Sequence, residues 1–192
     1  MKHSNIISLL LFIILTLSIS KSVGASDYLN DILRANSLYT EKRYAESIQA
    51  YELLIHEGAS NGYLHYNLGN AYIRVGKNGP AILNYIQAQK WIPRDENLAA
   101  NLKFAIQQTQ DKIEPPLPGT LNVLFFWVNN FNINELIYFS IVMNLVFWIT
   151  LTLWMNFPFL NIARNVCLGV LLLSFVSIGI KIMNESDMEL GV

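Results

Sequence analysis

Hydrogen-bonding side chains recur through the first part of this 192-residue sequence at positions that suit recognition of a peptide. Asparagine donates and accepts hydrogen bonds at once, so a row of asparagines can hold the backbone of an extended chain, and a nearby arginine adds a positive charge. The residues of this candidate groove are Asn36, Asn67, Asn70, Arg74 and Asn101. The alternative interpretation is that these asparagines are solvated or cap turns, and both stay open at this point.

No pattern typical of catalysis, or of a bound cofactor or metal, accompanies these residues. His56 and His65 lack a metal-ligand spacing such as HxxxH, and the sequence has no GxSxG, no CxxC and no phosphate-binding glycine loop. The single cysteine, Cys167, lies in an apolar run. The net charge is −1, without a basic stripe that would suit nucleic acid. We therefore expect no enzymatic activity, no cofactor, no metal and no nucleic-acid partner.

The elements that position the groove follow from an internal repeat. Residues 35–51 return as residues 69–85, a shift of 34 positions that aligns Asn36 with Asn70 and Tyr51 with Tyr85. A period of this length is typical of tetratricopeptide (TPR) arrays, in which each repeat is a helix–turn–helix unit. We expect an all-α fold, a short TPR α-solenoid of two repeats plus a capping helix, with the groove on the face formed mainly by the first helix of each repeat.

Apolar periodicity and helix breakers indicate where the helices of this domain begin and end. Pro80 suits the first turn of a helix, where its missing N–H costs little, and Pro93 ends that helix. Asp95 or Asn97 can cap the next helix. The expected helices include 44–56 and 63–75, and the last helix runs to about residue 110. Turns are expected at 41–43 and 76–79, and a first helix, with apolar residues from 29 to 38, precedes the first turn.

Large and small residues alternate as TPR packing requires, most clearly in the second repeat. Gly69 and Ala81 let the two helices approach closely, and Tyr85 fills the space beside them. His65 stands where the motif usually has tryptophan, and Arg34-Ala35 replaces Leu-Gly, so the first repeat is degenerate. The positions that match the motif are Leu68, Gly69, Tyr72, Ala81, Tyr85, Ala88 and Pro93.

The charge of the groove indicates what kind of ligand it suits. TPR domains that grip a C-terminal carboxylate add lysine and arginine to asparagines of this kind. The corresponding positions hold Ile32, Asn97 and Asn101 here, so the positive charge for such a grip is missing. A neutral peptide or helix is the expected ligand.

The second half of the chain is apolar. Residues 120–183 hold only Glu135, Arg164 and Lys181 as charged groups, and their uncharged runs are long enough to cross a bilayer of about 30 Å. The predicted order of parts is a signal peptide at 1–25, the TPR domain at 26–112, a Pro-rich linker at 113–120, an aromatic interfacial segment at 121–135, transmembrane helices at 136–154 and 165–183, and a tail at 184–192.

The signal peptide predicts the orientation of the two spans. It implies export through the bacterial inner membrane, with the TPR domain in the periplasm and the loop containing Arg164 in the cytoplasm. Asn144 lies near the centre of the first span, where an unpaired amide is costly. We expect it to face another helix, with Ser174 and Ser177 of the second span and another subunit as the alternatives.

The order of these parts resembles a known family. Together with the runs NLGNAY at 67–72 and RDENLAANLKFA at 94–105, it is similar to the aerotolerance-operon TPR protein E (BatE-like) family of Bacteroidetes and related bacteria. The resemblance covers nearly the whole chain. It implies a protein encoded beside membrane-anchored von Willebrand A-domain proteins and assembled with them. Many members continue into an SH3-like domain after the second span, and the sequence given ends at Val192 before such a domain.

Two functions remain after these observations. The leading expectation is a non-enzymatic scaffold of the inner membrane that presents a periplasmic TPR surface to protein partners in an envelope complex related to aerotolerance or stress. The alternative is a membrane sensor or a subunit of a transport complex, in which the transmembrane hairpin carries the activity.

Overall fold

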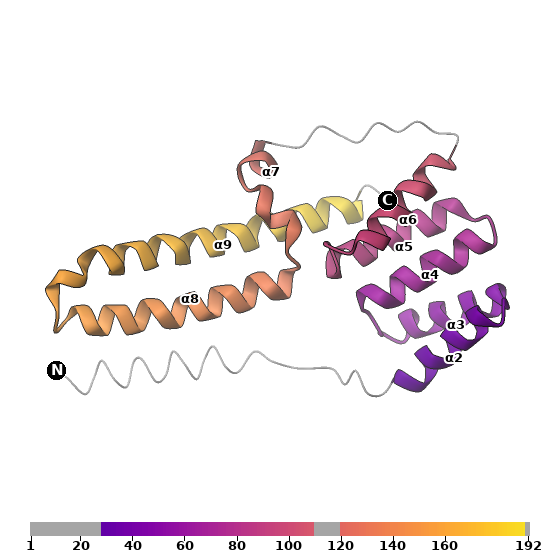
Figure 1. The fold of residues 1–192 in the computed structure, drawn as a ribbon, viewed down its shortest axis with the longest axis horizontal. Helices are drawn as coiled ribbons and strands as arrows, with labels where there is room; N and C mark the ends of the chain where they lie inside the picture. Colours follow the sequence, from indigo (N-terminus) through magenta and orange to yellow (C-terminus); the bar gives the residue numbers. More distant parts are fainter. Residues whose placement is uncertain (1–27, 110–119, 191–192) are drawn as a thin grey trace. The chain divides into compact units, whose positions relative to one another are not determined.

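The computed structural model describes residues 28–109 and 120–190, and these residues form helices without any strand (Figure 1). The predicted signal peptide at 1–25 and nearly all of the predicted linker at 113–120 lie outside the described residues. The elements are α2 (Leu29–Thr40), α3 (Tyr44–His56), α4 (Gly62–Arg74), α5 (Asn78–Trp91), α6 (Glu96–Gln107), α7 (Thr120–Leu124), η1 (Phe126–Asn130), α8 (Ile133–Trp154), η2 (Pro158–Leu160) and α9 (Asn161–Leu190). The all-α fold class is confirmed.

The chain divides into two compact units, one built around α2–α6 and one around the α8–α9 hairpin, and each is described by itself. In the first unit α2 packs on α3, α3 on α4, α4 on α5, and α5 on α6. Helix α4 also contacts α2 and α6, so it lies at the centre of this array. The largest fully buried side chains of its core are Tyr51, Leu54, Leu64, Tyr85 and Leu98.

The crossing of α4 and α5 depends on a glycine, as the sequence predicts. A Cβ atom added at Gly69 would lie 2.6 Å from Cε1 of Tyr85, far inside van der Waals contact. The Tyr85 ring is 1% exposed and Ala81 beside it is fully buried. The ring therefore packs directly on the α4 backbone, and only glycine leaves the space for it.

Helices α2 and α4 end in the same kind of turn. The Arg43 N–H donates to the Leu38 carbonyl oxygen at 2.9 Å, and the Lys77 N–H donates to the Tyr72 carbonyl oxygen at 3.0 Å. The residue before each donor is left-handed, with φ of 64° at Lys42 and 74° at Gly76. This is the Schellman arrangement, which satisfies the last helical carbonyls and favours glycine at the left-handed position.

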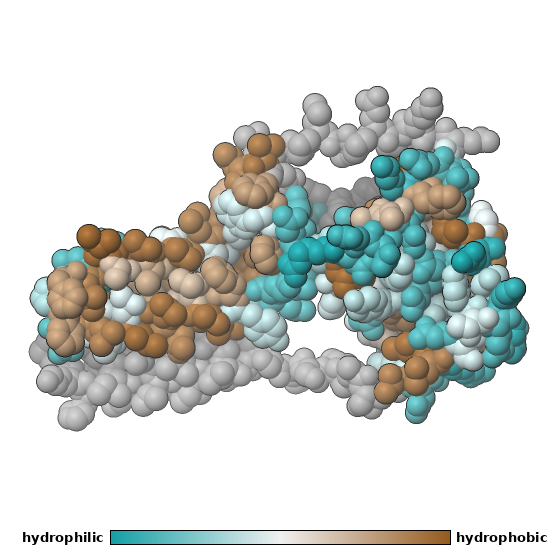
Figure 2. Space-filling model, viewed as in Figure 1, coloured by the Kyte–Doolittle hydropathy of each residue, from teal (hydrophilic) through white to brown (hydrophobic). Residues whose placement is uncertain are grey.

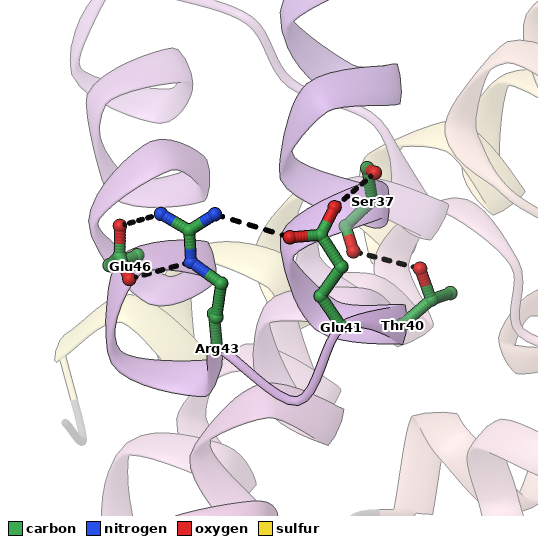
Figure 3. Close-up of polar contacts among 5 residues, drawn as sticks. All are labelled: Ser37, Thr40, Glu41, Arg43 and Glu46. Atoms are coloured by element: carbon green, nitrogen blue, oxygen red, sulfur yellow. Dashed lines mark hydrogen bonds and ion pairs between the residues drawn. The ribbon is translucent and has the colours of Figure 1, made fainter.

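Arg43 forms two surface ion pairs at the first of these turns. The Nε atom of Arg43 donates to Glu46 at 2.8 Å, and its Nη1 atom donates to Glu41 at 3.1 Å (Figure 3). The hydrogen bonds from Arg43 hold the pKa of the Glu46 carboxyl below its usual value. Both partners are about half exposed, so these ion pairs add little stability.

The helix starts of this unit are capped where the sequence offers a capping side chain. The Oδ1 atom of Asn61 accepts from the Leu64 N–H at 2.8 Å at the start of α4. At the start of α6, Oδ1 of Asp95 accepts from the Leu98 N–H at 2.9 Å. The prediction that Asp95 or Asn97 caps this helix is therefore confirmed, with Asp95 as the cap.

The second unit is a hairpin of two apolar helices. By length and composition, residues 133–154 and 158–186 are both able to cross a membrane. The apolar side chains on these helices point outward, as the brown surface of α8 and α9 shows (Figure 2). The helices extend beyond the predicted spans at 136–154 and 165–183, and the turn between them contains Pro158.

Polar contacts between described residues join the two helices of the hairpin. The hydroxyl oxygens of Ser140 and Ser174 lie 2.8 Å apart, and both side chains are buried. At the closed end the guanidinium of Arg164 lies 4.2 Å from the centroid of the Trp154 ring. That contact suits an arginine at a membrane interface, where its charge can reach water while its plane covers an aromatic ring.

Candidate protein-binding surface

Three helices supply the predicted groove residues, and the structure brings four of them into two hydrogen-bonded clusters. In the first, the Tyr51 hydroxyl donates to Oδ1 of Asn36 at 2.5 Å. The Nδ2 atom of Asn67 donates to the same oxygen at 3.2 Å. One asparagine oxygen therefore joins α2 to both α3 and α4.

The second cluster repeats the first one 34 positions later. The Tyr85 hydroxyl donates to Oδ1 of Asn70 at 2.8 Å, and Nδ2 of Asn101 donates to the same oxygen at 2.9 Å. Asn101 also donates to the Tyr66 hydroxyl at 3.1 Å. We refer to the two sets as the Asn–Tyr clusters: Asn36, Tyr51 and Asn67 in the first, and Asn70, Tyr85 and Asn101 in the second.

The alternative interpretation, that these asparagines are solvated or cap turns, leaves out the bonds that they make between helices. Their bonds to tyrosines and to each other are structural, because they tie successive helices together. Each cluster still keeps hydrogen-bonding capacity. Within the described part of the chain, Nδ2 of Asn36 and Asn70 and Oδ1 of Asn67 and Asn101 have no partner. Each cluster can therefore offer one donor and one acceptor to a peptide.

A pocket of about 180 Å³ opens at the first cluster. Three of the predicted residues, Asn36, Asn67 and Asn70, line it. The lining is completed by Tyr39, Thr40 and Tyr51. Asn101 is outside this lining and belongs to the second cluster.

Arg74 connects to the pocket through a tyrosine. Its side chain is exposed, and its Nε atom donates to the Tyr39 hydroxyl at 3.2 Å. This hydrogen bond raises the pKa of the Arg74 guanidinium above its ordinary value, so the residue stays a cation. A ligand in the pocket would meet uncharged amides and phenols, with a single positive charge close to Tyr39.

The tyrosines are the part of this surface that sequence reasoning missed. The sequence predicts that Tyr85 fills space, whereas its hydroxyl and that of Tyr51 also hold the asparagines in place. Burial raises the pKa of Tyr51 to about 12 and also raises the pKa of Tyr85, so both remain hydrogen-bond donors at neutral pH. The available signal was the spacing, since each tyrosine follows its asparagine by 15 positions.

A second pocket, of about 730 Å³, lies among α3, α4 and α5. Its lining includes both His56 and His65, which the sequence places on different helices. His65 is 9% exposed, with Nδ1 3.2 Å from Oδ1 of Asn84, and burial lowers its pKa. In the described residues no three histidine, cysteine, aspartate or glutamate side chains come together as a metal site would need. His65 is thus a packed residue.

In the hairpin, the two serines that the sequence suggests as partners of Asn144 form hydrogen bonds with other groups. Ser174, an expected partner of Asn144, pairs instead with Ser140, and the hydroxyl of Ser177 donates to the Leu173 carbonyl oxygen of its own helix. The half-buried amide of Asn144 makes no hydrogen bond in the residues that the structure describes. A contact with another subunit stays a prediction.

Comparison with known proteins identifies no relative of this chain. A scan against protein-family models finds no matching family, and searches of curated proteins and of solved structures find no similar protein or fold.

Proposed function

We propose that this chain is a non-enzymatic TPR scaffold of the bacterial inner membrane that binds protein partners through the surface of the Asn–Tyr clusters. The observation that carries the proposal is the repetition of the two clusters. A hydrogen-bonding arrangement that recurs at a 34-residue step presents equivalent donors and acceptors along a surface, as recognition of an extended peptide or a helix requires.

The two apolar helices support the membrane part of the proposal. They are long enough to anchor the chain, and the predicted signal peptide would put the TPR domain in the periplasm. The partners suggested by the family resemblance are membrane-anchored von Willebrand A-domain proteins. If both proteins are held at one membrane, a modest affinity per contact is sufficient, because anchoring raises their effective concentration.

Affinity capture from solubilised membranes tests the proposal. The full chain should recover one or more stable partners, and Asn70→Ala combined with Arg74→Ala should lose them. A matched control, Lys103→Ala with Gln107→Ala, removes the same kinds of groups from exposed positions of α6 and should keep them. Because Asn70 also joins Tyr85 and Asn101, Arg74→Glu is needed as a second variant that alters the exposed charge alone.

A second candidate function rests on one observation in the hairpin. The unpaired Asn144 amide would suit a sensor or a subunit of a transport complex, since polar groups inside membranes often mark functional sites. Asn144→Leu separates the two candidates. The scaffold predicts that this variant keeps the partners that its groove binds and a normal phenotype, whereas the alternative predicts a loss of phenotype with intact groove binding.

A further inference from the structure

The amide of Asn144 lacks the partner that its position demands. It lies in the middle of α8, which is long and apolar enough to cross a membrane. An amide without a hydrogen bond is costly in hydrocarbon, so such groups face other helices. Its own hairpin does not satisfy it, because no described residue of α9 bonds to it.

The serine and threonine side chains of α8 are already engaged. Ser140 pairs with Ser174 across the hairpin. Thr150 donates to the Val146 carbonyl oxygen and Thr152 to that of Trp148, both within α8. In the middle of α8 the need for an external partner therefore falls on Asn144, while Nε1 of Trp154, at the end of the helix, is a second buried polar atom without a hydrogen bond.

The position of Asn144 around the helix shows which face would meet that partner. Ser140, which bonds to Ser174, marks the side of α8 that faces α9. At about 100° of rotation per residue, Asn144 lies roughly 40° to one side of Ser140, and Ile141 lies farther round on the same side. Ile141 is 41% exposed, so this flank, unlike the seam with α9, is open.

We propose that two copies of this chain associate in the membrane through this flank of α8, with the Asn144 amides hydrogen-bonded to each other. An asparagine carries both donors and an acceptor, so a twofold axis beside it satisfies both copies with the same residue. The flank offers no charge that would select a different partner, since α8 has Glu135 as its only charged residue and that residue is in the first turn. This inference rests on the membrane location proposed above and not on the ligand of the groove.

Energy transfer between two differently labelled copies of the full chain in lipid vesicles tests the proposal. The native chain should show transfer well above that of an unrelated two-span protein at the same density. Asn144→Leu should weaken association by about three- to thirtyfold, as loss of one or two such bonds in a membrane would do. Asn144→Gln, which keeps the amide, should retain most of the transfer. The matched control Val146→Leu, on the opposite flank of α8, should leave it unchanged.

Disulfide formation between copies tests the face itself. In a Cys167→Ser background, Ile141→Cys should give a covalent dimer on oxidation, and Val146→Cys should give much less. The proposal is overturned if the transfer stays at the level of the unrelated protein, if Asn144→Leu matches the native chain, or if Ile141→Cys crosslinks only to a different protein. Extraction of the chain from membranes by carbonate would instead contradict the proposed membrane function.

Discussion

The helix pairs α2–α3 and α4–α5 form equivalent contacts from different residues. Tyr51 bonds to Asn36 in the first pair as Tyr85 bonds to Asn70 in the second. The pairs differ at the helix crossing, where the first has Ala35 and the second has Gly69. They also differ at the left-handed residue of the turn, which is Lys42 in the first and Gly76 in the second.

A comparison of the two pairs shows which interactions set the geometry of the helix crossing. The first pair lacks the glycines of the second at both places, yet its turn and its Asn–Tyr bond match those of the second pair. Ser47 adds a bond of its own, since its buried hydroxyl donates to the Ala35 carbonyl oxygen at 2.9 Å. At the helix crossing, a hydrogen bond from Ser47 therefore joins the first pair, whereas close packing against Gly69 joins the second.

A substitution at Gly69 tests the glycine packing of the second pair and should change stability the most. Gly69→Ala gives this position the residue that the first pair has, but the new Cβ would overlap the Tyr85 ring. We expect a loss of about 1–3 kcal/mol in the free energy of unfolding, the usual cost of overpacking a core. Chemical denaturation of the detergent-solubilised chain, followed by circular dichroism, measures it.

Gly79→Ala is the matched control for that substitution. Gly79 is in the first turn of α5, and a Cβ there meets no atom within 4 Å. Stability should stay the same or rise slightly, because alanine favours helix. Equal losses from both substitutions would show that close packing at Gly69 is not what holds the second pair.

High pH tests the Asn–Tyr clusters in both pairs at once. Burial raises the pKa of Tyr51 to about 12, above the value of 10 expected in an unfolded chain. The folded state thus binds more protons above pH 10, so its stability is intact below that pH and falls as the pH rises towards 12. Unfolding followed between pH 8 and pH 12 should show this decline, and it should be weaker in Tyr51→Phe. A pH-independent stability would contradict the buried position of these phenols.

Removal of single hydroxyls tests whether the clusters are equivalent. Tyr51→Phe and Tyr85→Phe should each cost about 1 kcal/mol, the net value of one hydrogen bond. Tyr63→Phe, at a residue that is 60% exposed, should change nothing. If only one of the two cluster variants loses stability, the two clusters contribute unequally to stability although their geometry is alike.

The smallest effect concerns the turn of the first pair. Lys42 adopts the left-handed conformation at φ 64°, which glycine adopts without the steric cost of a Cβ. Lys42→Gly should therefore stabilise the protein by about 0.5–1 kcal/mol, as a helix-terminating glycine does. Gly76→Lys should have the opposite sign. A fall in the midpoint of denaturation for Lys42→Gly would contradict the left-handed conformation of Lys42 in this turn.

Much of the helix arrangement could be predicted from the sequence, because it depends on local signals. Helix α3 has the predicted bounds, 44–56, and the close contact of Gly69 with Tyr85 follows from their residue types. Asp95 could be named as a cap for the same reason. The left-handed Lys42 could not be foreseen from its residue type, but its alignment with Gly76 at the 34-residue step carried that information.

The candidate site could be predicted only in part, since its geometry depends on contacts between helices. The sequence identifies the asparagines but not their bonds, because one oxygen of Asn36 meets groups from two other helices. The hairpin shows the same limit. Ser140 and Asn144 are one turn apart on α8, and only the packing of α9 decides which of them lies in the seam. Sequence periodicity gives a helix face but not the neighbour that covers it.

Site-specific photocrosslinking in intact cells tests most directly whether the Asn–Tyr surface binds a protein. A photoreactive residue at position 40, where the exposed Thr40 lines the pocket, should give a discrete covalent adduct with another protein. The same residue at position 89, where Gln89 is exposed on α5, should not. The adduct from position 40 should disappear in Arg74→Glu. Equal adducts from both positions, or none from position 40 in cells that hold the chain in their inner membrane, would contradict the proposed scaffold.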